Sequence, residues 1–236
     1  MLSRVEARFD DHVVVSDGAT GSELLAMLPS HGHLDLAALE HPREVLAVHL
    51  SYLAAGAELL LTATFAASRP RLERLQAGDR VEIVNLEAVK LARDAREIAG
   101  VDALVGGSIG PLAGVIDLDD PAGRATIAAA HAEQAASLAG RGADLLVLET
   151  FFRLDELELA IRAVREVSSL PIIASLTFPD ESAPENVAAN AEKVRRLLEA
   201  DLLAAGVNCC LLYTSDAADD LLCVDLGGRR IIKKHK

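Results

Sequence analysis

Aromatic residues are scarce in this sequence, and tryptophan is absent. Phe and Tyr together make up only 3% of the 236 residues. A single large core must therefore be built from Ala, Leu, Val and Ile, a composition that suits helices packed on parallel strands better than a β-sandwich. The three cysteines form no spaced framework, and the first residues carry no apolar export segment. We therefore expect a protein of the reducing cytoplasm.

Positive charge is also in deficit. The chain carries 23 Lys and Arg against 36 Asp and Glu, a net charge of −13. A surface this acidic repels phosphate backbones and anionic lipids, so neither nucleic acid nor a membrane is an expected partner. The longest weakly charged run, residues 45–67, divides into the end of a helix and a following strand, so we predict no membrane span.

Short apolar runs recur along the chain and alternate with stretches of helical periodicity. Each run is continuous, which is typical of parallel strands buried on both faces. The predicted strands are residues 12–16, 58–62, 103–107, 144–149, 172–177 and 203–208. The predicted helices are residues 43–55, 81–99, 121–139, 154–167 and 186–200.

Two α/β architectures compete for this alternation. A doubly wound nucleotide-binding sheet needs a glycine-rich turn directly after its first strand, and residues 17–21 (DGATG) match that turn poorly. A (β/α)8 TIM barrel instead collects polar side chains at the carboxyl ends of its strands. Such residues follow the predicted strands: Asp17, Thr62, Thr64, Ser108, Glu149, Thr177, Asn208 and Cys209. We therefore predict a TIM barrel that is incomplete, with about six βα units.

The character of the chain changes after Cys209. Residues 210–236 (CLLYTSDAADDLLCVDLGGRRIIKKHK) hold two of the three cysteines and end in a basic run, whereas the preceding chain is strongly acidic. This segment is too short for two further βα units, and it resembles the translation of a sequencing adapter. A short strand–turn–helix cap is the alternative. We predict a truncated barrel domain over residues 1–209 and a non-family tail over residues 210–236.

Six motifs before the tail resemble the homocysteine S-methyltransferase family. In family order they are residues 17–24 (DGATGSEL), 42–65 (PREVLAVHLSYLAAGAELLLTATF), 107–111 (GSIGP), 142–151 (GADLLVLETF), 170–178 (LPIIASLTF) and 206–209 (GVNC). One such string would be weak evidence, but six in order, each at a predicted strand end, are specific. The resemblance implies a TIM barrel in which the thiolate of homocysteine accepts a methyl group to give methionine.

The resemblance also implies which residues bind the substrate. Asp17 and Glu149 match the family residues that hold the ammonium group of homocysteine, and backbone N–H groups near Gly18 and Ala19 would take its carboxylate. A turn or helix N-cap is the alternative for Asp17. Glu149 closes an apolar run, where an acid has less structural reason to stand.

A zinc ion is the cofactor that the resemblance implies. Zinc held by three cysteine thiolates can bind the substrate sulfur and deprotonate it. Cys209 matches the family ligand that follows the sixth strand, but the adjacent cysteine pair that completes the set has no counterpart in this sequence. Cys210 and Cys223 lie in the tail, and we do not expect them to replace that pair. A small buried hydrophobe is the alternative for Cys209.

Three functions compete on this basis. The first is a zinc-dependent methyltransferase that acts on homocysteine and a methyl donor that the sequence does not identify. The second is a catalytically inactive barrel fragment, because loss of two βα units would open the core and expose strand edges. The third, a Schiff-base aldolase, needs a lysine at the barrel mouth, but outside the tail the only lysines are Lys90 and Lys193, both on predicted helices.

Overall fold

Parallel strands in chain order form the centre of the molecule. The computed structural model describes residues 4–28, 33–178, 184–209 and 230–233. Its parallel strands are β1 (Leu59–Leu61), β2 (Leu104–Ile109), β3 (Leu145–Phe151), β4 (Ile172–Leu176) and β5 (Ala204–Val207). Each strand is joined to the next through helix, as in repeated βαβ units. The α/β barrel architecture predicted from the sequence is confirmed, in incomplete form.

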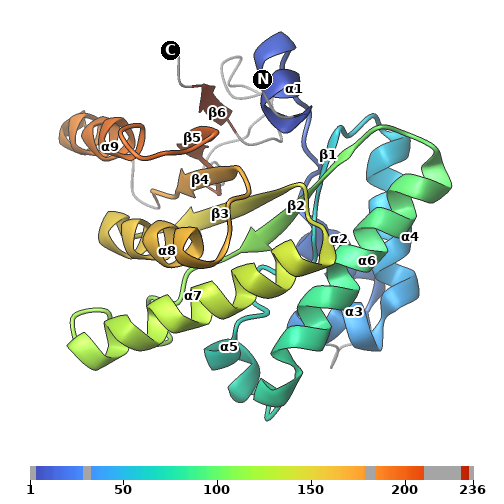
Figure 1. Cartoon of the computed structure of the whole chain (residues 1–236), viewed down its shortest axis with the longest axis horizontal. Helices are drawn as coiled ribbons and strands as arrows, with labels where there is room; N and C mark the ends of the chain where they lie inside the picture. The colour runs from blue at the N-terminus through green and yellow to red at the C-terminus, as the bar shows by residue number, and fades with distance from the viewer. Residues whose placement is uncertain (1–3, 29–32, 179–183, 210–229, 234–236) are drawn as a thin grey trace.

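Helices cover the outer face of this curved sheet (Figure 1). The five predicted helices are all present, as α4 (Pro42–Ala54), α6 (Val81–Ala99), α7 (Pro121–Arg141), α8 (Leu154–Val167) and α9 (Pro184–Leu197). Shorter elements join them: α2 (Thr20–Met27), η1 (Leu34–Leu36), α3 (Ala37–Glu40), α5 (Arg69–Glu73) and η2 (Gly78–Arg80). Within the described residues, no helix is both long enough and apolar enough to cross a membrane.

The two edges of the sheet differ from the sequence-based expectation. The prediction of a strand over residues 12–16 is wrong, because only Ser16 forms a single parallel bridge, to Leu59. Val13 and Val15 in this run are exposed, so the run is not buried on both faces as a barrel strand would be. At the other edge, β6 (Arg230–Lys233) pairs antiparallel with β5, where a further βα unit would add a parallel strand. β6 belongs to the predicted tail, whose boundary at residue 209 stays a prediction.

Alternate strand positions pack on opposite faces of the sheet. Val105, Leu146 and Ala174 belong to the apolar cluster between the sheet and helices α6 to α9. Their chain neighbours belong to a second cluster on the inner face, which includes Leu104, Leu145, Val147, Ile173 and Ala204. The strands are therefore buried on both faces, as their continuous apolar runs predict.

Helix α1 (Arg4–Asp11) covers the inner cluster on the side of the sheet away from α7 and α8 (Figure 1). Its Val5 and Phe9 side chains are only 7% and 6% exposed, and both pack into the inner cluster. This helix was not predicted from the sequence. It closes the sheet at one end and leaves the other end to the polar residues described below.

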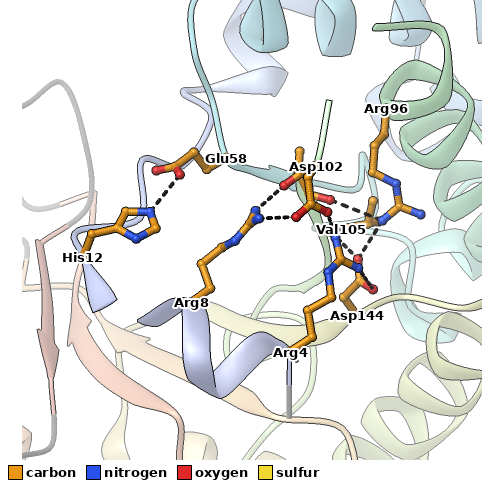
Figure 2. A network of polar contacts seen from close by, with 9 residues as sticks. Arg4, Arg8, His12, Glu58, Arg96, Asp102, Val105 and Asp144 are labelled. Carbon is orange, nitrogen blue, oxygen red and sulfur yellow. Dashed lines mark hydrogen bonds and ion pairs between the residues drawn. The ribbon is translucent and has the colours of Figure 1, made fainter. Parts of the chain in front are cut away.

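Ion pairs attach α1 to the segments that lead into the strands (Figure 2). Arg4 and Arg8 both pair with Asp102, which lies two residues before β2. Asp144, directly before β3, accepts the Val105 N–H at 2.8 Å and pairs with Arg96 at 3.0 Å. These contacts show that α1 lies at the amino ends of the strands.

Candidate functional site

A polar layer occupies the inner face at the carboxyl ends of the strands. Side chains alternate across a strand, so a residue that stands an even number of places after an inner-face residue shares its face. From Leu104, Leu145, Ile173 and Ala204 this alternation leads to Ser108, Glu149, Ser175 and Asn208. All four are buried, and all four are linked by hydrogen bonds.

Glu149 is the acidic residue of this layer, and it is 6% exposed. Its Oε1 accepts a hydrogen bond of 2.6 Å from the Ser108 hydroxyl, and its Oε2 accepts one of 3.2 Å from the Asn208 amide. Both of these donors are neutral groups, and the two bonds orient the carboxylate. A buried carboxylate held in this way can receive a small cationic group.

Asn208 organises the layer. Its Oδ1 accepts the Ser175 hydroxyl at 2.8 Å and the Thr150 N–H at 2.9 Å, while its Nδ2 also donates to the Thr150 hydroxyl at 2.8 Å. Thr150 has a φ of 63°, a conformation that is costly for a β-branched residue. The amide of Asn208 therefore holds both Glu149 and the unusual backbone directly after it. Sequence reasoning placed Asn208 at a strand end but gave it no role in the site.

Asp17 lies at the same carboxyl edge of the sheet, after the bridge at Ser16. Its side chain is buried, and Oδ2 accepts the Leu61 N–H of β1 at 2.8 Å. The α2 N-terminus has no side-chain cap, so the N-cap alternative for Asp17 is wrong. Asp17 and Glu149 are thus placed at one edge of the sheet, with β1 and β2 between their strands.

Gly18 and Ala19 connect Asp17 to the start of α2. A Cβ atom at Gly18 would lie 2.8 Å from the hydroxyl oxygen of Tyr52, so a side chain at this position would require Tyr52 to shift. The backbone N–H groups here stand at the amino end of a helix, where an anion is favoured. The structure therefore places the two predicted substrate-binding backbone groups directly beside Asp17.

Hydroxyl groups tie the end of β1 to β2. Thr62 and Thr64 share a hydrogen bond of 2.6 Å between their hydroxyl oxygens. Thr62 accepts the Ser108 N–H at 3.0 Å, and Thr64 donates to the Ser108 carbonyl at 2.7 Å. The two threonines thus fix the backbone of Ser108, whose own hydroxyl contacts Glu149.

Cys209 is an exposed free cysteine directly after Asn208. Its backbone has a φ of 50°, and its carbonyl accepts the Thr177 hydroxyl at 2.9 Å. The amide Nδ2 of Asn208 lies 3.9 Å from its Sγ, so the thiol borders the polar layer. The alternative of a buried hydrophobe is therefore wrong for Cys209.

The described residues do not fit a complete zinc site. Among them, no three His, Cys, Asp or Glu side chains are grouped so that they could hold a metal ion. Cys209 is the one thiol in this part of the chain, and Cys210 and Cys223 lie outside the described residues. One thiolate is fewer than the three protein ligands of a typical catalytic zinc site.

Comparison with known proteins gives consistent matches over most of the chain. The family model described as homocysteine S-methyltransferase matches residues 14–222. An S-methylmethionine–homocysteine S-methyltransferase (BHMT2) of Pongo abelii is 30% identical over 216 residues, which cover 89% of this chain and 54% of that protein. A betaine–homocysteine S-methyltransferase 1 of Xenopus laevis is 28% identical over 217 residues, covering 89% and 51%. The chain thus spans about half the length of the curated relatives it matches.

A solved structure extends this similarity to three dimensions. The metallated form of the homocysteine methyltransferase MmuM from Escherichia coli superposes with a TM-score of 0.72 at 26% identity. The match covers 89% of this chain and 79% of that one. The polar layer and its neighbours, residues 16 to 209, fall inside the matched family region.

Proposed function

Because the chain belongs to the homocysteine S-methyltransferase family, we propose that its polar layer binds homocysteine for transfer of a methyl group to the substrate sulfur. The observation that carries this proposal is the buried carboxylate of Glu149, oriented by Ser108 and Asn208 at the edge that also holds Asp17 and Cys209. The product would be methionine. In the reaction the donor–methyl bond breaks, an S–CH3 bond forms, and the thiol proton is lost.

In this proposal, different residues of the site bind the ammonium group, the carboxylate and the thiol of homocysteine. Glu149 and Asp17 supply negative charge for the ammonium group, which a buried carboxylate pairs with strongly when it is pre-oriented. The backbone N–H groups of Gly18 and Ala19 take the substrate carboxylate at the amino end of α2. The thiol of homocysteine then points toward Cys209, at the opposite end of the polar layer.

We propose Zn²⁺ as the cofactor and Cys209 as one of its ligands. Zinc bound by thiolates supplies a Lewis acid that favours the thiolate form of the substrate. The described residues contribute one such ligand, Cys209. Zinc content after dialysis, measured by mass spectrometry, should fall in Cys209→Ser. Equal zinc in the two proteins would contradict a ligand role for Cys209.

A second function is favoured by the same incomplete ligand set. The chain would then be a catalytically inactive barrel fragment that keeps the homocysteine site, with residues 1–209 as the barrel domain and residues 210–236 as a tail. The methyl donor, which in the relatives is named as S-methylmethionine or betaine, belongs to the first function only.

One experiment separates these functions. The full chain is titrated with L-homocysteine by calorimetry, then incubated with homocysteine and either S-methylmethionine or betaine in the presence of Zn²⁺, and methionine is measured by mass spectrometry. Binding with methionine formation supports the methyltransferase, and binding without it supports the inactive fragment. Absence of homocysteine binding would overturn the proposed site.

A further inference from the structure

The loop between β2 and α7 is held at its first peptide groups by two charged side chains, the half-buried Arg71 and the buried Glu156. It begins at Gly110, two residues after Ser108. Arg71 of α5 donates from Nη2 to the Pro111 carbonyl at 2.8 Å. On the next two residues, Oε1 of Glu156 accepts the Leu112 N–H at 2.5 Å and the Ala113 N–H at 3.0 Å. A cation and an anion thus hold three consecutive residues from α5 and α8.

Glu156 is far more buried than this backbone contact alone requires. It stands in the first turn of α8 and is 0% exposed, although Asp155 and Glu158 on the same helix reach solvent. Its Oε2 has no hydrogen-bond partner among the described residues. A buried carboxylate is costly unless it is paired, so its retention here calls for a role.

His131 of α7 lies beside this carboxylate. Its Nε2 is 3.9 Å from Glu156 Oε1, and its ring contacts Phe151 of β3 at a centroid distance of 5.8 Å. Neither ring nitrogen has a hydrogen-bond partner within the described part of the chain. The loop is therefore held from two helices of the barrel's outer layer, from α5 by Arg71 and from α8 by Glu156, and His131 of α7 lies beside the Glu156 carboxylate.

The loop between β2 and α7 follows directly on the residues of the proposed substrate site. Ser108, which orients Glu149, precedes Gly110 by two residues, and the Gly110 N–H donates to the Phe65 carbonyl at 3.0 Å. At its far end, Asp119 pairs with Arg153 at 2.7 Å, and Arg153 follows Glu149 by four residues. The loop is thus tied at its start to the segment after β1 and at its far end to the connection between β3 and α8.

We propose that Glu156 is a positioning residue for the homocysteine site, which it serves by fixing the loop that follows Ser108. This inference rests on the proposed function. With the loop held, the Ser108 hydroxyl stays on Glu149 Oε1 and the carboxylate keeps the direction in which it meets the substrate ammonium group. Glu156 does not itself contact the substrate.

Three variants test this role in the full chain. Glu156→Leu removes the acceptor, Glu156→Gln keeps an oxygen acceptor for the two N–H groups, and Arg71→Met releases the same segment from the other side. Glu158→Gln is the matched control, since Glu158 pairs only with Arg196 on the outside of α8 in the contacts described. Two quantities are measured: amide hydrogen exchange at Leu112 and Ala113, and the Kd for L-homocysteine well below the melting temperature.

Glu156→Leu should accelerate exchange at these amides by about tenfold or more and raise the Kd about tenfold. Glu156→Gln should recover both values to within about threefold, Arg71→Met should show a smaller change in the same direction, and the control should match the unmodified chain. A rise in loop exchange without a change in Kd would overturn the positioning role. If Glu156→Leu fails to fold, Glu156→Gln and Arg71→Met test the positioning role in its place. An unchanged Kd in Arg71→Met despite faster exchange at the loop amides would then overturn that role.

If the proposed function is wrong, the unmodified chain itself will give a different result from the one expected above. If the unmodified chain binds no homocysteine, the substrate assignment and the positioning role both fall. The exchange data would in that case still report whether Glu156 holds the loop.

Discussion

The two ends of the sheet use charge in opposite ways. At the amino ends of the strands, oppositely charged side chains pair with one another: Arg4 and Arg8 pair with Asp102, whose side chain is 68% exposed (Figure 2). At the carboxyl ends, Glu149 is 6% exposed and is held by the neutral donors of Ser108 and Asn208. The first arrangement attaches a helix, whereas the second orients a buried carboxylate.

The ion pairs at the amino ends of the strands are not the main source of stability for α1. Exposed ion pairs contribute little to the free energy of unfolding, because water and salt screen them. The attachment of α1 must therefore depend mainly on the apolar contacts of Val5 and Phe9 with the inner cluster.

Truncation of Phe9, which packs from α1 into the inner cluster, should cause the largest loss of stability. Phe9→Ala should lower the free energy of unfolding by about 3 kcal/mol, because it removes a nearly buried ring and leaves a cavity. Urea denaturation followed by circular dichroism measures the change. The control is Phe152→Ala, at a side chain that is 52% exposed, which should cost less than about 1 kcal/mol. Equal losses in the two variants would mean that α1 does not close the inner cluster.

Neutralisation of the buried carboxylate should leave the fold intact and weaken the binding of homocysteine. Glu149→Gln should weaken homocysteine binding about 30-fold, or about 2 kcal/mol, because a neutral amide cannot pair with an ammonium group. Calorimetric titration measures the Kd, and Glu158→Gln on the surface of α8 serves as the control. An unchanged Kd in Glu149→Gln would make the carboxylate a structural group and erase the contrast between the two ends.

Acid should lower the stability of the fold through His49, a buried residue of α4. Complete burial of His49 in α4 lowers its pKa to about 4, whereas in the unfolded chain it titrates near its ordinary value of 6.5. Below pH 6.5 the unfolded state binds a proton that the folded state refuses, so stability falls as the pH drops from 6.5 toward 4. At pH 5.5 the loss should be about 1.4 kcal/mol.

Urea denaturation at several pH values checks this prediction, with His49→Leu as the comparison. The variant should lose the part of the pH slope that His49 causes between pH 6.5 and pH 4. An identical slope in both proteins would mean that other groups control the acid response.

The sequence predicts the repeating part of the fold well. Helix α6 has the predicted bounds because the apolar periodicity of residues 81–99 ends at Gly100, which adopts a φ of 66° that favours glycine. Helix α8 likewise begins with acidic residues that complement its dipole. Such signals are local, so they can be read without knowledge of the tertiary structure.

The elements at the edges depend on distant contacts and were missed. Helix α1 is mostly polar, and its two buried residues pack on strands 50 to 200 positions away in the chain. The run at residues 12–16 looks like a strand, but in the described structure it is bridged only at Ser16. Local composition cannot reveal either outcome, because each outcome depends on which distant segments of the chain pack against the residues concerned.

The same limit applies to the site. Asp17, Glu149 and Cys209 were found because they match family motifs at strand ends, and the structure places all three at one edge of the sheet. The roles of Asn208 and Ser175 were not predicted. A continuous apolar run does not show which residues face inward, so the hydrogen bonds among inner-face residues appear only once the sheet is built.

Removal of one exposed charge should produce the smallest effect. Asp102→Asn leaves an oxygen acceptor for Arg4 and Arg8 but removes the ion pairs, so Tm should fall by less than about 2 °C. About 0.5 M NaCl should abolish the difference from the unmodified chain, because salt screens exposed pairs. Calorimetric melting with and without salt measures both quantities. A larger fall that persists in salt would show that the charges, rather than Val5 and Phe9, hold α1, and the two ends of the sheet would then differ less than their exposure implies.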